Sequence, residues 1–172
     1  MAHADTDLTN PPPIRSGCLG LLINYADAVL MVRPTYKDDG LYQLPGGGAR
    51  ENEPPWEATR REVLEETGLH VQPRRLLVLD WISAKPEKNI AAGANYVYWC
   101  GRVPDHTAVT LPEPRNDHED PELDHYRWLR GAELEGYCAP YQARRVRAAL
   151  QARVHGTLME LRHGHPLYEE AV

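Results

Sequence analysis

The stretch between residues 46 and 68 constrains this chain more than any other part of its sequence. Three glycines at 46–48 interrupt regular structure, and residues 54–67 then have the composition and periodicity of a helix. Pro54 and Pro55 fit the first helical turn, where proline is tolerated. Gly68 stands where a left-handed C-terminal cap is expected. The sequence therefore predicts a helix over 54–67 that is defined at both ends.

This helix is predicted to have an apolar side and an acidic side. At about 100° per residue, the apolar side collects Trp56, Val63, Leu64 and Thr67. Glu62, Glu65 and Glu66 are spaced i, i+3 and i+4, so their carboxylates share an arc on nearly the opposite side. Like charges at this spacing repel one another, and a divalent cation would relieve that repulsion. Mg²⁺ prefers hard oxygen ligands and commonly binds carboxylates together with substrate phosphates.

Taken alone, an acidic helix face is commonly just solvated, and a glycine run is commonly a turn. Together, their spacing resembles the signature of the Nudix hydrolases. That signature is a glycine, five residues, a glutamate, seven residues, and then Arg-Glu-aliphatic-any-Glu-Glu-any-Gly-aliphatic. Gly47 and Glu53 match its first two positions, and residues 61–69 read Arg-Glu-Val-Leu-Glu-Glu-Thr-Gly-Leu, ending at Leu69. Every fixed position and both gaps match, and the Leu-Pro-Gly-Gly lead-in at 44–47 is also typical of that family.

The resemblance implies a divalent metal site on the predicted helix. Nudix hydrolases bind their metals through the glutamates of this segment, so Glu62, Glu65 and Glu66 are expected ligands. Glu62 has a second possible role as the base that activates water. The backbone carbonyl of Gly47 is expected to add a further ligand. The expected metal is Mg²⁺, with Mn²⁺ as an alternative.

The resemblance also assigns bracing and proton transfer. Glu53 and Arg61 are expected to brace the metal site. Some family members take their general base from a later loop, just before a strand that contains tryptophan, and Glu122 before Trp128 fits that description. Other acids of this loop stay open as alternatives: Asp117, Glu119, Asp120 and Asp124. A loop that is merely acidic and solvated stays open as well.

The family reaction is the attack of water on one phosphorus of a nucleoside diphosphate linked to another group. A diphosphate repels an anionic nucleophile, and metal ions neutralise its oxygens and lower the pKa of bound water. ADP-ribose or another nucleotide sugar is the first expected substrate. A nucleoside triphosphate, ordinary or oxidised, is the alternative substrate. A module that senses a nucleotide sugar without cleaving it is the alternative function.

Five further residues are candidates for substrate contact. Arg33, Tyr36 and Lys37 lie between the first strands and the glycine run, where family members often contact phosphate or base. Trp81 and Tyr96 are aromatic residues of expected strands, so either one can stack on a base or pack in the core.

The rest of the sequence predicts an α/β fold of the α+β type. Short strands are expected at 18–23, 29–32, 76–82, 96–103 and 126–129, with turn residues at 24–27 and a loop at 104–121. A second helix is expected over 141–155. This order indicates a mixed sheet with helices on its faces, and the resemblance implies the Nudix-like α/β/α sandwich. We expect a flexible N-terminal arm over 1–13 and a single Nudix hydrolase domain over 14–172.

Charge and cysteine content limit the partners and the setting. The formal net charge is −6, whereas nonspecific binding of nucleic acid needs the opposite sign. A small-molecule nucleotide is therefore expected, held with the help of a metal or a few placed basic side chains. No apolar run approaches the roughly 18–20 residues of a membrane span. Three cysteines without a CxxC pair fit a reducing, cytoplasmic setting. The resemblance also allows a homodimer.

Overall fold

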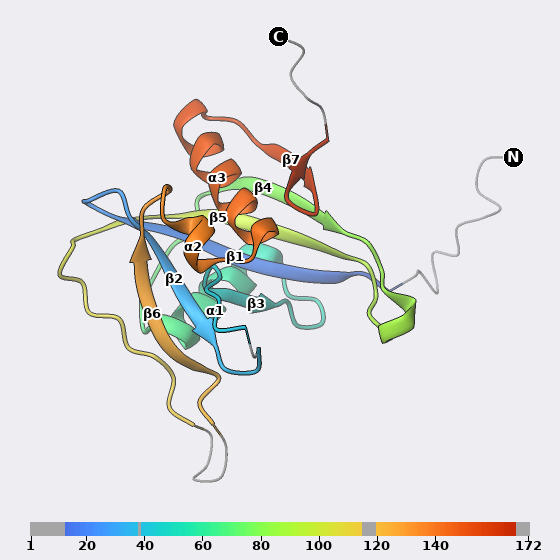
Figure 1. The fold of residues 1–172 in the computed structure, drawn as a ribbon, viewed down its shortest axis with the longest axis horizontal. Helices are drawn as coiled ribbons and strands as arrows, with labels where there is room; N and C mark the ends of the chain where they lie inside the picture. The colour runs from blue at the N-terminus through green and yellow to red at the C-terminus, as the bar shows by residue number, and fades with distance from the viewer. Residues whose placement is uncertain (1–12, 38, 115–119, 168–172) are drawn as a thin grey trace, which may run out of the picture.

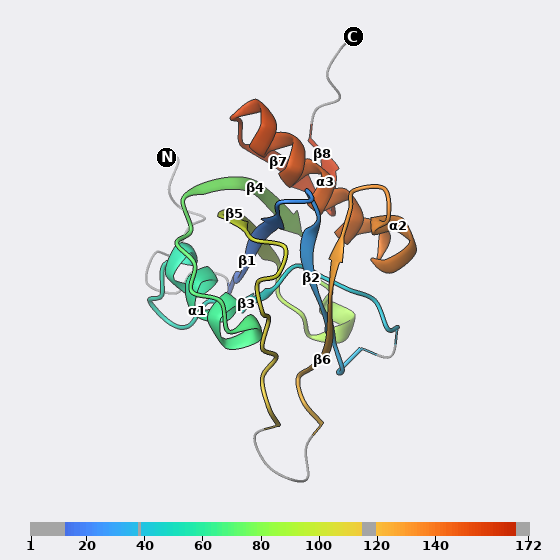
Figure 2. The same cartoon turned by 90° about the vertical axis from the view of Figure 1, so that its left-hand side faces the viewer.

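A mixed β-sheet with helices on both of its faces forms the body of the chain (Figures 1 and 2). The computed structural model describes residues 13–37, 39–114 and 120–167. Of the predicted N-terminal arm at 1–13, only Pro13 lies within the described residues. The architecture confirms the predicted fold class, an α+β chain with helices packed on a mixed sheet.

Eight strands and four helical segments are described. The strands are β1 Arg15–Asn24, β2 Val29–Pro34, β3 Gly46–Gly48, β4 Arg75–Ile82, β5 Gly93–Val103, β6 Leu123–Leu129, β7 Met159–Arg162 and β8 His165–Pro166. The helices are α1 Pro55–Thr67, the 3₁₀ helix η1 Pro86–Lys88, α2 Leu134–Tyr137 and α3 Pro140–His155. The strand order is β6-β2-β1-β5-β4-β7-β8, and β3 pairs with β1 beside that path. No described helix combines the length and apolar character that a membrane crossing requires.

The sheet is mixed because two of its strand pairs are parallel. Strand β1 runs parallel to β5, and β4 runs parallel to β7. The pairs β1–β2, β1–β3, β2–β6, β4–β5 and β7–β8 are antiparallel. Parallel neighbours cannot be joined by a tight hairpin, and in this chain the long connections between them carry α1 and α3 onto the sheet.

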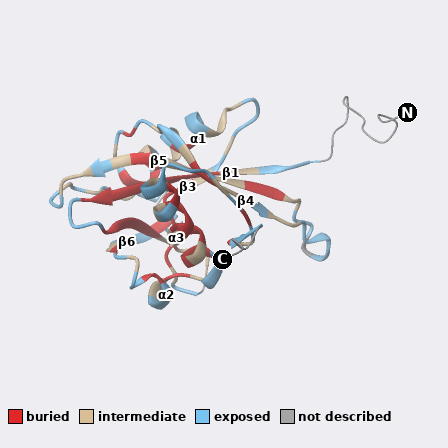
Figure 3. Ribbon diagram, turned by 90° about the horizontal axis from the view of Figure 1, so that it is seen from above, coloured by how far each residue is buried: buried red, intermediate tan, exposed pale blue. Residues whose placement is uncertain are grey.

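Strand β1 supplies side chains to a hydrophobic core on each face of the sheet. Leu19, Leu21 and Ile23 join the larger core, which also contains the buried apolar residues of α2 and α3. Leu22 joins the smaller core, where it meets Val63 of α1. This alternation follows from the two-residue period of a strand, and it explains why each face needs a covering helix. Figure 3 shows the buried segments along the central strands and on α3.

Helix α1 has the predicted ends but a different buried side. Pro54 stands at its N-cap and Gly68 at its C-cap, where φ is 70° and the Gly68 N–H donates to the Leu64 oxygen at 2.9 Å. Trp56, predicted on the core side, is 51 % exposed, whereas Glu66 is only 7 % exposed. The prediction for Trp56 is wrong because strand β3 packs against the acidic side of the helix. The helix therefore buries one of its own carboxylates.

Further differences concern segments without a strong local pattern. The glycines at 46–48 form strand β3 with β1, although the sequence predicted only an interruption there. Strands β4, β5 and β6 begin one to three residues before their predicted starts. The hairpin of β7 and β8 lies in the C-terminal segment, where no element is predicted from the sequence. Pairing with β1 and β4 creates these elements, so their local sequence alone does not mark them.

The packing of α1 on β1 predicts that alanine is tolerated less well at Gly20 of β1 than at an open glycine elsewhere. A Cβ added at Gly20 of β1 would lie 2.6 Å from Val63 Cγ2, so Gly20→Ala should lower the free energy of unfolding by about 1–3 kcal/mol. A Cβ added at Gly136 of α2 meets no atom within 4 Å, so Gly136→Ala should leave stability unchanged or raise it slightly. Urea unfolding measures both changes. A wild-type midpoint for Gly20→Ala would contradict this packing.

Candidate active site

The acidic side of α1 meets the glycine strand β3 at short range. The backbone N–H of Gly46 donates to Glu66 Oε2 at 2.6 Å. A Cβ added to Gly47 would lie 2.5 Å from Glu62 Oε2. A Cβ added to Gly46, whose φ is 139°, would collide with the carbonyl oxygen of Cys18. Glycine is therefore required at both positions, since a side chain at Gly47 would push β3 away from the helix carboxylates and one at Gly46 would push it away from β1.

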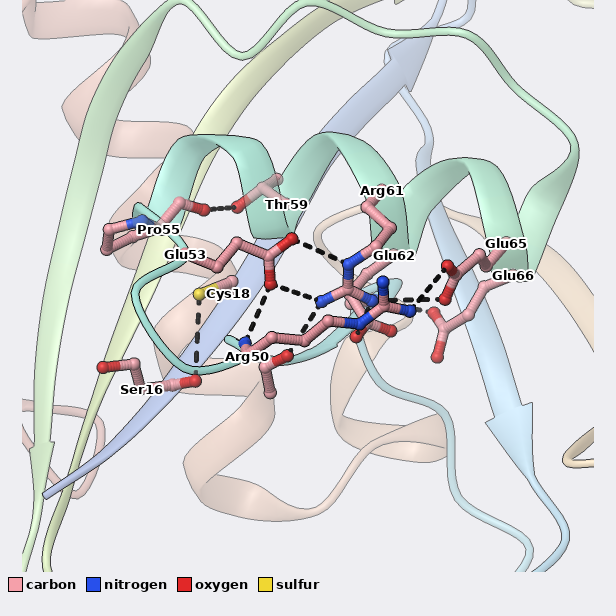
Figure 4. Close-up of polar contacts among 12 residues, drawn as sticks. Ser16, Cys18, Arg50, Glu53, Pro55, Thr59, Arg61, Glu62, Glu65 and Glu66 are labelled. Atoms are coloured by element: carbon pink, nitrogen blue, oxygen red, sulfur yellow. Dashed lines mark hydrogen bonds and ion pairs between the residues drawn. The ribbon is translucent and has the colours of Figure 1, made fainter. Parts of the chain in front are cut away.

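Two arginines hold the carboxylates at this junction (Figure 4). Arg61 pairs with Glu53 at 2.7 Å and with Glu62 at 2.6 Å, and it reaches Glu65 at 3.2 Å. Arg50 binds the same cluster from the loop before α1. Its backbone N–H donates to Glu53 Oε2 at 2.8 Å, and its guanidinium lies 3.4 Å from Glu65. The structure thus joins the two residues expected to brace the site, Glu53 and Arg61, to the helix glutamates.

Glu53 and Glu62, both partners of Arg61, have pKa values shifted in opposite directions. The hydrogen bonds from Arg61, together with the Arg50 backbone N–H, lower the pKa of Glu53 to about 2. Glu53 is therefore held as a carboxylate. Burial raises the pKa of Glu62, although the hydrogen bond and the charge of Arg61 oppose that increase.

Glu66 is the carboxylate on which a nearby cation would act most strongly. Burial raises the pKa of Glu66 to about 8. The Gly46 N–H opposes this increase, while the charges of Glu62, Glu122 and Glu65 add to it. A positive ion at the junction would offset both the burial and the mutual repulsion of these acids.

The donor chemistry of the junction fits a divalent metal ion. Three carboxylates come from one helix, those of Glu62, Glu65 and Glu66 (Figure 4). The Glu62 carboxylate lies beside Gly47 and the Glu66 carboxylate beside Gly46, and carboxylate and carbonyl oxygens are the hard donors that divalent ions prefer. In this geometry Arg61 is the partner of Glu62 and Glu65. Among the described residues, no three His, Cys, Asp or Glu side chains are grouped to hold a metal. A bound metal would replace Arg61 as the partner of these two carboxylates.

A cleft of about 920 Å³ borders β3 and the loop that precedes α1. Its lining contains five basic side chains, Arg15, Lys37, Arg50, Lys85 and Arg145, and two acidic ones, Glu51 and Glu53. The whole chain carries a net charge of −6, so this local excess of basic groups favours an anionic ligand. The three α1 glutamates are not part of the lining. Glu53 belongs to both the lining and the Arg61 network, and it therefore connects the cleft to α1.

The cleft contains two of the five residues predicted to contact substrate. Tyr36 and Lys37 line it, next to the glycine strand. Arg33, Trp81 and Tyr96 are not among the lining residues. Trp81 instead is 40 % exposed near the end of β4. The structure therefore gives Tyr36 and Lys37 access to a ligand in the cleft and gives the other three no place there.

The two best-placed candidates for the general base have different partners. The charge of Glu122 contributes to the raised pKa values of Glu62 and Glu66, so its carboxylate lies within electrostatic reach of α1. Asp124 is hydrogen-bonded and ion-paired to Arg33 at 2.7 Å, which lowers the pKa of Asp124. Two of the alternatives lie outside the described residues: Asp117 and Glu119.

One wall of the cleft comes from residues that the sequence analysis missed. Tyr141, Gln142 and Arg145 of α3 line the cleft together with His163 of the turn between β7 and β8. Arg145 is 2 % exposed and pairs with Asp80 of β4 at 2.7 Å. An acid inside an otherwise apolar strand is a sequence signal that points to a buried cationic partner, although it does not say which residue that partner is.

The chain is similar to proteins of one family over most of its length. Residues 13–150 match the family model described as NUDIX domain. The RNA pyrophosphohydrolase of Rhizobium meliloti (strain 1021) is 32 % identical over 124 residues, which are 67 % of this chain and 74 % of the relative.

Solved structures share the fold at lower identity. The MutT protein from Methanosarcina mazei Go1 has a TM-score of 0.64 and 19 % identity, over 84 % of this chain and 96 % of that chain. The NUDIX domain of Shewanella oneidensis NrtR, solved in complex with ADP ribose, has a TM-score of 0.66 and 18 % identity. That match covers 88 % of this chain and 95 % of the NrtR chain.

The buried carboxyl of Glu66 predicts a pH-dependent stability. An acid whose pKa is raised by folding binds its proton more tightly in the folded state, so stability is lost as the pH rises from about 4.5 to about 8. Glu66→Gln removes this charge and keeps an acceptor for the Gly46 N–H. Without metal, the variant should be more stable than the wild type by roughly 2–4 kcal/mol at pH 8, and equally stable at pH 4.

Unfolding in the presence of a chelator, followed at both pH values, measures this difference. Glu57→Gln is the matched control, because Glu57 is an exposed glutamate on the same helix. If Glu66→Gln and Glu57→Gln had the same dependence of stability on pH, Glu66 would not have a raised pKa in the folded state.

Proposed function

This chain belongs to the Nudix hydrolase family, and we propose that it hydrolyses the diphosphate linkage of a nucleotide sugar in a reaction that depends on a divalent metal. The observation that carries the proposal is the junction of α1 and β3, where three helix carboxylates meet a glycine strand beside a basic cleft. ADP-ribose is the first representative of this substrate class. Mg²⁺ is the first metal to test, and Mn²⁺ is the second.

The carboxylates of α1 would hold the metal, which supplies charge neutralisation for the diphosphate and lowers the pKa of bound water. Glu62, Glu65 and Glu66 are the proposed ligands, with Gly47 contributing its backbone carbonyl. Arg61 also pairs with Glu53 at 2.7 Å, and Glu53 is not a proposed ligand, so this pair would hold Arg61 beside a bound metal. Because Glu53 stays ionised at neutral pH, it fixes the guanidinium beside the site.

Glu122 is the proposed general base. It directly precedes β6, and its backbone is anchored because the Thr35 N–H donates to the Glu122 carbonyl at 3.0 Å. The Thr35 hydroxyl also donates to the Pro121 carbonyl at 2.6 Å. In the reaction, Glu122 accepts a proton from the attacking water as the new O–P bond forms. The bridging P–O bond breaks, and the second phosphate leaves with its electron pair. Glu62 is the alternative base.

The cleft supports a small nucleotide as the substrate. Its volume of about 920 Å³ lies in the range of roughly 300–1,000 Å³ that is common for small-molecule sites. Lys37, Arg15 and Lys85 supply positive charge along it. The overall net charge of −6 disfavours long anionic polymers, which make contacts well beyond one cleft.

A second candidate function is the removal of pyrophosphate from the 5′ end of RNA. It is favoured by the relative from Rhizobium meliloti, an RNA pyrophosphohydrolase that is 32 % identical to this chain. The 5′ end of a primary transcript is a nucleoside triphosphate, so the same carboxylates would act on either substrate. The two candidates differ in whether a nucleotide chain must continue beyond the cleft.

A substrate panel tests both candidates. It contains ADP-ribose, other nucleotide sugars, ordinary and oxidised nucleoside triphosphates, dinucleoside polyphosphates and a 5′-triphosphorylated oligoribonucleotide, each with Mg²⁺. We expect phosphate-linkage cleavage of the nucleotide sugars with the highest kcat/KM. A higher kcat/KM for the oligoribonucleotide would favour the second candidate. Tight binding of a nucleotide sugar in calorimetry, without turnover of any panel member, would replace hydrolysis with sensing.

The proposed metal ligands predict a second result with the same assay. Glu65→Gln and Glu66→Gln should each lower kcat/KM by about 100-fold or more, because charge stabilisation of the transition state is lost. Glu57→Gln, on the exposed side of the same helix, should keep wild-type activity. Activity that survives Glu66→Gln would remove Glu66 from the metal site.

The proposed base predicts an effect on kcat with little change in KM. Glu122→Gln should lower kcat by about 10²–10⁴-fold. Asp124→Asn should lower it far less, because Arg33 already engages Asp124 at 2.7 Å. Steady-state kinetics at neutral pH separates the two variants. Equal losses in both, or a loss confined to Asp124→Asn, would transfer the role away from Glu122.

A further inference from the structure

We propose that the end of the cleft far from the glycine strand binds a phosphate group other than the diphosphate to be cleaved, so that the substrate is a nucleotide with a second, remote phosphate. This inference rests on the proposed function and narrows its substrate class. Three segments carry it: the start of β1, the connection from β4 to β5, and the turn between β7 and β8.

The cleft crosses the sheet from one strand to the next. Near its start, β1 has β3 on one side and β5, β4 and β7 in succession on the other. The lining follows the same order, with Gly47 of β3, Gly17 of β1, Asn95 of β5, Ile82 of β4 and His163 after β7. Neighbouring strands lie about 4.8 Å apart, so the cleft is roughly 19 Å long between β3 and that turn. The two phosphorus atoms of one diphosphate share a bridging oxygen, and they therefore cannot occupy both ends.

The charges of the lining are distributed unevenly along this length. Its two acids, Glu51 and Glu53, both belong to the loop between β3 and α1, at the near end. Arg15, Lys85 and His163 line the far end. A region of basic side chains without acids, in a chain whose net charge is −6, favours an anion at the far end.

The first two cations are brought together by the connection from β4 to β5. The Arg15 Nε donates to the Ala91 carbonyl at 2.9 Å, so this side chain extends from β1 toward the start of β5. Lys85 and Ile90 exchange backbone hydrogen bonds of 2.8 and 3.1 Å, which close the connection beside it. Figure 1 shows the start of β1 next to this connection. Neither Arg15 nor Lys85 forms an ion pair within the described part of the chain.

The turn between β7 and β8 adds His163 to this end. Arg162 pairs with His165 across the turn, and both central residues have a positive φ, 53° at His163 and 78° at Gly164. Two-residue turns of this kind favour asparagine followed by glycine, so the backbone alone does not select a histidine here. The His163 ring is held at Nε2 by Ser83, whose hydroxyl lies 3.2 Å away. A neutral or charged imidazole has at least one N–H donor, and His163 therefore adds a donor beside the two cations.

The far end is an addition to the fold that the family model describes. The hairpin of β7 and β8 lies after residues 13–150, which match that model. The turn is joined to the sheet because the His163 N–H donates to the Trp81 carbonyl at 3.0 Å and the Gly164 N–H donates to Asp80 at 3.0 Å. The hairpin is thus fixed to β4, where it closes the cleft.

A phosphate is the anion that fits donors from three separate segments. A phosphate monoester has three terminal oxygens, whereas a carboxylate has only two. Charge-assisted hydrogen bonds from arginine and lysine to phosphate are among the strong ones. Two sources supply such a group: a monoester on the ribose of the nucleotide, or the first phosphodiester of a longer nucleotide chain.

Calorimetric binding with Mg²⁺ tests the inference on three ligands that lack a diphosphate linkage: AMP, adenosine 3′,5′-bisphosphate and the 5′-phosphorylated dinucleotide of adenosine. We expect at least one of the last two to bind about tenfold more tightly than AMP, because its remote phosphate gains charge-assisted hydrogen bonds. A gain with the bisphosphate identifies the monoester as the source. A gain confined to the dinucleotide identifies the diester. Equal affinities for all three ligands, or binding of none, would overturn the inference.

Lys85→Gln and His163→Asn should each remove most of this gain and leave the affinity for AMP unchanged. Asparagine suits the first position of the turn, so His163→Asn should unfold at the wild-type urea concentration or above it. Arg162→Gln is the matched control, because Arg162 is exposed, precedes the same turn and lies outside the cleft lining. A gain that persists in either variant, or that Arg162→Gln reduces equally, would show that the far end does not bind the remote phosphate.

The outcomes separate this inference from the proposed function. A gain from the remote phosphate without turnover of any diphosphate would keep the far-end site and remove the hydrolase. Turnover of nucleotide sugars without such a gain would keep the hydrolase and remove the far-end site.

Discussion

The hydrogen bond from the Gly46 N–H to Glu66 places a carboxylate in the interior at the line where β3 meets α1. That contact requires glycine in β3, because a side chain on Gly47 would occupy the space of the Glu62 carboxylate. It also requires the helix to turn acids toward the protein, where their burial opposes ionisation. A cation at the junction would relieve the cost that this geometry places on the ionised carboxylates, and their oxygens are hard donors. The unfavourable burial and the proposed chemistry thus have one cause.

Two arginines, Arg61 and Arg145, neutralise acids of the fold in two different ways. Arg61 lies among several carboxylates, and a cation at the junction would compete with it for Glu62 and Glu65 while Glu53 would remain its partner. Arg145 has a single buried acid, Asp80, and an amide at its other end. This contrast follows from the number of acids around each guanidinium.

Local patterns made the ends of α1 predictable, and contacts between distant segments limited the rest. The two prolines and Gly68 mark the helix ends by their own backbone preferences. Which side of α1 is buried depends on β3, a strand that exists only through its pairing with β1. The helical periodicity alone therefore places Trp56 on the wrong side. The wall of Gln142 and Arg145 forms where β4, α3 and the β7–β8 turn meet, and no local sequence pattern predicts that these segments come together. The motif likewise identifies the acids of the junction, but it does not indicate which of them would bind metal and which would accept a proton.

The two polar networks share no residue, so a substitution in one network should have little effect on the other. The network of Glu53, Arg61 and the helix glutamates belongs to the α1 side of the sheet, whereas Asp80, Arg145 and Gln142 belong to the α3 side. Substitutions that do not share partners usually act independently on free energy. Substitutions among Asp80, Arg145 and Gln142 should therefore leave the charges at the junction unchanged. A signature confined to α1 and its glycine lead-in consequently carries no information about the residues on the α3 side of the sheet.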